Sequence, residues 1–194
     1  MCDLPTIIAL LGTAGGLITA SLIALGVAIV LNNGFFSAPA SPAAMIIAGG
    51  LLVGAVVALV PAAGKINDYV QCMGAATACA GELSNLQNAL TALISVLLIQ
   101  ATASFVAAGI AWVPWAGQIP MWVILGSLVM QLILIPTIIA FFNDLVRCAE
   151  AAAAATAAAT EPLVLSPFIA VLVVGIVYLA SAYVYVYYSQ RNKD

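Results

Sequence analysis

Five long apolar runs make up most of the chain and are separated by short, more polar segments. The runs cover about residues 6–31, 42–61, 86–112, 121–142 and 167–188. Each is about 20 residues or longer, which at 1.5 Å per residue lets a helix cross a hydrocarbon core of about 30 Å. Barrel strands are about ten residues long and alternate in polarity. The pattern therefore predicts five transmembrane helices.

Side chains near the starts of three runs indicate where the helices begin. Ser41-Pro42 and Ser166-Pro167 each place a side-chain acceptor at the N-cap and a proline at the first helical position. Ser84 and Gln87 have the spacing of a capping box. These residues predict helix starts close to positions 41, 84 and 166.

A six-residue pattern follows both the second and the fourth apolar run. Residues 67–72 (Asn-Asp-Tyr-Val-Gln-Cys) recur as residues 143–148 (Asn-Asp-Leu-Val-Arg-Cys), and a proline, Pro61 or Pro136, precedes each copy. We call these two segments the repeat signature. Self-similarity of this kind indicates a duplicated unit.

The duplication divides the chain into three parts. Residues 1–78 form hairpin unit one, residues 79–160 form hairpin unit two, and residues 161–194 hold a fifth span with a short polar tail. Because each unit contains two spans, the copies have the same orientation in the membrane, unlike inverted transporter repeats. The predicted fold is an all-α integral membrane protein with two tandem helical hairpins and a fifth C-terminal span.

Composition supports the membrane assignment. The chain is 65% hydrophobic and 6% charged, with four basic and seven acidic residues and a net charge of −3. A soluble domain carries about 25% charged residues, so the solvent of this chain is the lipid bilayer. No basic patch is present that would indicate a nucleic-acid partner.

Five spans place all four cysteines just outside the membrane on one face, which we call the cysteine face. They are Cys2, Cys72, Cys79 and Cys148. Two disulfides, Cys2–Cys72 and Cys79–Cys148, would close each hairpin unit on itself. Other pairings, free thiols, and a redox or metal role remain open. The chain contains no histidine and no C-x-x-C motif, so the usual zinc spacings are absent.

Charge and cysteine content give an orientation. The basic residues Lys65 and Arg147 of the cysteine face each lie three positions from an aspartate, whereas Arg191 and Lys193 in the tail are unpaired. The positive-inside rule then favours a cytoplasmic C-terminus, and disulfides require the cysteine face and the N-terminus to be extracytoplasmic. Intracellular proteins of hyperthermophiles are an exception to the disulfide argument.

The spans contain no ionisable residue, which disfavours proton pumps, rotor-ring proteolipids and ion-coupled carriers, because these place a carboxylate at mid-membrane. Their most polar side chains are Gln100 and Gln131, near the middle of the third and fourth spans. A mutual hydrogen bond across that hairpin would satisfy both amides. The competing interpretation is that they line a pore or substrate site.

Two further features have a structural and a functional interpretation. Small residues recur four apart in the first span (Gly12, Gly16, Ala20) and the second (Gly50, Gly54). They would let helices pack closely within the hairpin or dock another subunit. The Asn-Asp pairs of the repeat signature, Asn67-Asp68 and Asn143-Asp144, indicate capping and turn chemistry or, through both aspartates, cation binding.

These observations favour a non-catalytic accessory or structural subunit of a larger membrane assembly, acting through helix–helix contacts with other membrane subunits or with itself. The alternative is a small channel or carrier with a polar path past Gln100 and Gln131. A third hypothesis is a membrane thiol–disulfide oxidoreductase, although the C-x-x-C pair that tunes thiolate reactivity is absent. No catalytic residue, cofactor or metal site is expected.

Overall fold

A computed structural model of the chain describes residues 3–33, 40–110 and 118–154. These residues form four α-helices and contain no strand: α1 (Leu4–Asn33), α2 (Ala40–Cys72), α3 (Ala80–Gly109) and α4 (Gln118–Ala154). The all-α prediction is confirmed for the described part of the chain. The predicted fifth span at 167–188 lies outside the described residues.

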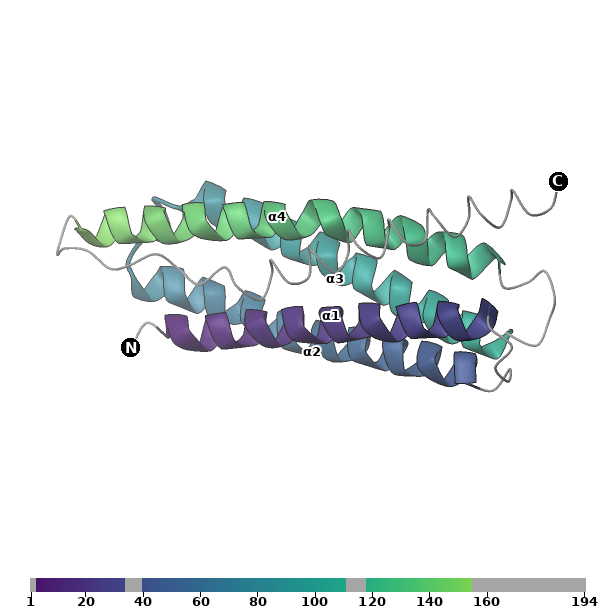
Figure 1. Ribbon diagram of the computed structural model, residues 1–194. Helices are drawn as coiled ribbons and strands as arrows, with labels where there is room; N and C mark the ends of the chain where they lie inside the picture. The colour runs from purple at the N-terminus through teal and green to yellow at the C-terminus, as the bar shows by residue number, and fades with distance from the viewer. Residues whose placement is uncertain (1–2, 34–39, 111–117, 155–194) are drawn as a thin grey trace.

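The four helices lie lengthwise beside one another, and consecutive helices run in opposite directions (Figure 1). α1 packs on α2, α2 on α3, and α3 on α4, so the main contacts follow chain order. The start of α1, the end of α2, the start of α3 and the end of α4 lie at one end of the bundle. This end corresponds to the predicted cysteine face.

All four helices are long and apolar enough to cross a membrane. The candidate spans are Leu4–Ala28, Pro42–Cys72, Ala80–Gly109 and Trp122–Ala154. α2 has 33 residues and α4 has 37, or roughly 50 and 55 Å at 1.5 Å per residue. Because this exceeds a hydrocarbon core of about 30 Å, these helices either tilt or project beyond it.

Several helix ends differ from the sequence prediction. α2 begins at Ala40 and α3 at Ala80, so Ser41 follows the helix start and Ser84 lies a full turn inside α3. Cys79 occupies the N-cap of α3 without a side-chain capping hydrogen bond. The capping box of Ser84 and Gln87 is therefore wrong, because the alanine-rich sequence before Ser84 extends the helix toward its N-terminus.

Asp3 caps α1, which the sequence analysis did not single out. The backbone N–H of Thr6 donates to the Asp3 carboxylate in a long bond of 3.4 Å, and a donor three residues on is the one that an aspartate N-cap binds. Hydrogen bonding by Thr6, mainly through its side chain, lowers the pKa of the Asp3 carboxyl. The carboxylate thus satisfies one of the N–H groups that every helix start leaves unpaired.

Small residues set how closely the helices approach. Within the first hairpin, a Cβ on Gly54 would lie 3.4 Å from Leu17 Cδ1, and Ser21 donates a hydrogen bond to the Ala48 carbonyl at 3.1 Å. Between α2 and α3, a Cβ on Gly49 would lie 2.9 Å from the Phe105 ring. At these glycines a side chain of the neighbouring helix packs directly on the helix backbone, which gains dispersion contacts without a hydrophobic driving force.

Candidate functional site

A pair of glutamine side chains lies in the middle of the α3–α4 contact. Gln100 is completely buried and Gln131 is 2% exposed. The Nε2 group of Gln131 donates a hydrogen bond to Oε1 of Gln100. The two side chains that the sequence analysis paired therefore lie in contact, and the amide of each is held within the hairpin rather than exposed to lipid.

The amide pair leaves one donor and one acceptor unused. Gln100 Nε2 and Gln131 Oε1 are buried and have no hydrogen-bond partner. Flipping both amides would exchange the roles of the atoms but still leave one N–H group and one oxygen without a partner. An unsatisfied buried polar atom costs free energy. The favourable packing of the surrounding side chains must therefore offset the cost of the two unpartnered atoms.

Two serines extend the polar cluster by one helical turn. Ser104 follows Gln100 by four residues on α3, and Ser127 precedes Gln131 by four on α4; both are buried. Their hydroxyls donate to carbonyls of their own helices, Gln100 at 2.9 Å and Ile124 at 2.7 Å. These serines were not among the predicted site residues, although a spacing of four residues from each glutamine places them on the same helix faces.

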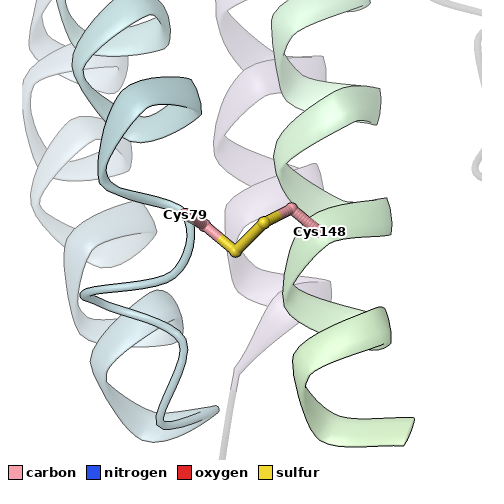
Figure 2. The surroundings of a disulfide bond; sticks show 2 residues. All are labelled: Cys79 and Cys148. Carbon is pink, nitrogen blue, oxygen red and sulfur yellow. A yellow bond between two sulfur atoms is a disulfide. The ribbon is translucent and has the colours of Figure 1, made fainter.

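A disulfide closes the same hairpin near the cysteine face (Figure 2). Cys79, at the N-cap of α3, bonds Cys148 of α4 with a Cα–Cα distance of 5.9 Å and a sequence separation of 69. The predicted Cys79–Cys148 bond is present. Cys79 is fully buried, while Cys148 is partly exposed.

Cys72, the last residue of α2, is also disulfide-bonded. Its predicted partner, Cys2, lies outside the described residues, so the Cys2–Cys72 pair remains a prediction. None of the described cysteines is a free thiol.

The repeat signature lies inside helices rather than at their ends. α2 continues through Pro61 to Cys72, and α4 continues through Pro136 to Ala154. Asn67-Asp68 and Asn143-Asp144 are therefore neither caps nor turns, and that interpretation is wrong. Polyalanine after Cys148 favours further helix, and membrane helices tolerate an internal proline.

The two copies of the repeat signature share a pattern of exposure. In both, the asparagine is partly buried, the aspartate is exposed, and the next two residues are buried (Tyr69 and Val70; Leu145 and Val146). Asp68 and Asp144 thus lie on outward positions of their helices. Among the described residues, no group of three or more cysteine or acidic side chains is arranged to hold a metal ion.

The glycines with four-residue spacing in the first hairpin fall into two groups. Gly54 faces Leu17 inside the hairpin, as described above. A Cβ added to Gly12, Gly16 or Gly50 would meet no atom within 4 Å. These three glycines are therefore not required for the packing of the described helices.

Neither a protein-family model, nor a curated protein, nor a solved structure matches this chain. The packing and chemistry of its own residues are what indicate its function.

Proposed function

We propose that this protein is a non-catalytic subunit of a membrane assembly and acts through contacts between its helices and those of other subunits. The observation that carries the proposal is the outward face of α1. Ala9, Thr13 and Gly16 are exposed there, and Gly12 and Ala20 are partly exposed beside them. α1 packs mainly on α2, so this small-residue face is left open by the described helices.

Gly12 and Gly16 have the four-residue spacing that lets two helix backbones approach closely. A Cβ at either position would enter open space, whereas a Cβ at Gly54 would contact Leu17 of the neighbouring helix. The buried amide pair and the absence of charged residues from the middle of the described helices support the same proposal, because their polar groups serve packing.

We also propose a duplicated hairpin architecture with a fifth span and a defined orientation in the membrane. The equal exposure patterns of the repeat signature support two duplicated hairpins, with a fifth span at 167–188. The Cys79–Cys148 bond supports an extracytoplasmic cysteine face and N-terminus, because disulfides persist in oxidising compartments. The C-terminal tail is then cytoplasmic.

The test is purification in mild detergent. We expect a tagged chain to be recovered with other membrane subunits, or with further copies of itself, in fixed stoichiometry. Gly16→Leu is expected to weaken this association, because the leucine fills the open face. Val57→Leu, at an exposed position of α2 away from this face, is the matched control. Recovery of a single, unassociated chain that still folds would contradict the proposal.

One observation favours the alternative of a small channel or carrier. The unpartnered Gln100 Nε2 and Gln131 Oε1 present a donor and an acceptor inside the bundle. Flux of a polar solute through liposomes containing only this protein, abolished by Gln100→Leu with Gln131→Leu, would support that function. The thiol–disulfide oxidoreductase hypothesis has less support, since the described residues hold no free thiol that could attack the Cys79–Cys148 bond.

A further inference from the structure

One helix carries nearly all the exposed hydroxyl groups of the described helices. Among side chains that the structure describes, the exposed Ser and Thr residues in helices are Thr13 on α1 and Ser84, Thr91, Ser95 and Thr102 on α3. Asn88 of α3 is exposed as well. The distribution over the helices is therefore strongly uneven.

The α3 residues form a single stripe. With 3.6 residues per turn, Ser84, Asn88, Thr91, Ser95 and Thr102 lie on the side of α3 opposite its buried positions. Those buried positions, among them Leu93, Leu97 and Gln100, face α2 and α4. The polar stripe thus points away from both neighbouring helices.

Exposed positions on α2 and α4 have a different character. On α2 they include Ile46, Ile47, Val53, Val57 and Val60, and on α4 they include Trp122, Val123, Val129, Met130 and Ile133. These are the residues expected against lipid. α3 exposes four of the same kind, Leu98, Ile99, Phe105 and Val106, but it alone adds a row of exposed polar side chains. Serine, threonine and asparagine are instead enriched where one membrane helix packs on another.

We infer that the polar stripe of α3 is the contact between two copies of this chain, packed in parallel about a two-fold axis along the membrane normal. The inference rests on the proposed function and adds a second contact surface, separate from the small-residue face of α1, whose partner is another copy of the chain. All copies of a chain insert in the same direction, so each α3 meets another α3 at equal depth. Near the axis of such an interface, each residue meets its own counterpart.

The chemistry of the stripe suits such self-pairing. A hydroxyl or an amide both donates and accepts hydrogen bonds, so it can bond an identical group, whereas a charged side chain repels its counterpart. Glu82, the one charged residue of α3, lies on the other side of the helix. The polar positions of the stripe are therefore neutral and self-complementary, and the exposed Leu98 and Val106 lie beside them.

The hydroxyls are available for this contact. Thr91 and Ser95 donate to the carbonyls of Gln87 and Thr91 at 2.8 and 2.9 Å, and Thr102 donates to Leu98 at 2.8 Å. Each oxygen keeps lone pairs to accept a bond, and its hydrogen can rotate toward a partner. The hydrogen bonds within α3 satisfy these hydroxyl groups while the helix inserts into the membrane, before it contacts a second copy of the chain.

The experiment is disulfide cross-linking in native membranes. Ser95→Cys and Thr102→Cys place a thiol on the polar stripe, and mild oxidation is followed by non-reducing electrophoresis. The matched control is Val129→Cys, because the Gln100–Gln131 register puts Val129 of α4 at the depth of Thr102, and its side chain is 46% exposed. The wild-type chain controls for its native cysteines.

We expect a covalent dimer from both stripe variants and little from Val129→Cys. Adding Thr91→Leu to Thr102→Cys is expected to reduce the dimer severalfold without changing the thermal stability of the chain. Equal cross-linking of the stripe and control variants would overturn the inference, since it indicates random collision.

Two other outcomes would show that something other than a second copy of the chain lies against the polar stripe. A cross-linked product of another mass means that a different subunit covers the polar stripe, which overturns self-pairing but leaves the proposed subunit function intact. Labelling of Thr102→Cys by a membrane-impermeant thiol reagent means that the face is lined by water, which contradicts both proposals.

Discussion

Gln131 donates a side-chain hydrogen bond to Gln100 across the α3–α4 contact, from 31 residues away in sequence. Because the helices are antiparallel, each step along α3 is matched by a step back along α4. Ser104 and Ser127 therefore lie at the same depth, as do Leu93 and Ile138. The amide contact fixes the register near mid-helix, whereas the Cys79–Cys148 bond, closer to the cysteine face, pairs positions offset by four residues from it.

The amide pair gives the first prediction. Gln100→Leu or Gln131→Leu alone removes the bond and leaves a buried amide with no partner, which is expected to destabilise the protein by about 1–3 kcal/mol. The double variant removes both amides and is expected to be close to wild type in stability. A double-mutant cycle of unfolding in detergent measures the coupling. Additive losses in the double variant would show that the two amides do not interact.

The Cys79–Cys148 bond gives the second prediction. In the chain-entropy model, opening a loop of 69 residues removes about 4 kcal/mol of stability, and this is an upper bound because the membrane already restricts the unfolded chain. We expect Cys79→Ala and Cys148→Ala to lower the unfolding temperature equally. The double variant is expected to match either single variant, and non-reducing peptide mapping identifies the bond. A clearly larger loss in the double variant would mean that each cysteine stabilises the fold independently.

Neighbouring glycines on α2 give the third prediction. A side chain at Gly49 meets the Phe105 ring, whereas one at Gly50 enters open space. Gly49→Leu is expected to cost about 1–3 kcal/mol through overpacking, while Gly50→Leu is expected to stabilise the helix by up to about 1 kcal/mol. Unfolding in detergent compares the two variants. Phe105→Ala is expected to relieve the Gly49→Leu defect, and failure to do so would exclude this contact as its cause.

The orientation gives the fourth prediction. Thr77 is exposed in the connection between α2 and α3, on the proposed extracytoplasmic side. Thr77→Cys is expected to react with a membrane-impermeant thiol reagent in intact cells. Lys193→Cys in the predicted tail is expected to react only after permeabilisation. The reverse pattern would invert the proposed topology.

Much of the fold follows from the sequence because lipid imposes simple rules. A bilayer requires about 20 apolar residues per helix, so the first four runs could be recognised from length and composition alone. The pairing of Gln100 with Gln131 could also be predicted, because two strongly polar side chains in apolar neighbouring helices have few other partners. The ends of the helices were less predictable, since α2 and α4 continue through Pro61 and Pro136 despite the missing proline N–H groups. α3 also begins in the alanine-rich segment, before the capping signal of Ser84 and Gln87.

Only the tertiary structure decided which small and polar residues face inward. Gly49 and Gly50 are adjacent and chemically identical, yet one lies against Phe105 and the other faces open space. Ser104 and Thr102 are similarly close in sequence but lie on opposite sides of α3. The sequence by itself determined that the chain forms apolar membrane helices with a polar pair in their middle, because hydrophobicity and helix length are local properties. Which side of each helix is buried depends on the neighbouring helices, so it was decided by their packing in the tertiary structure.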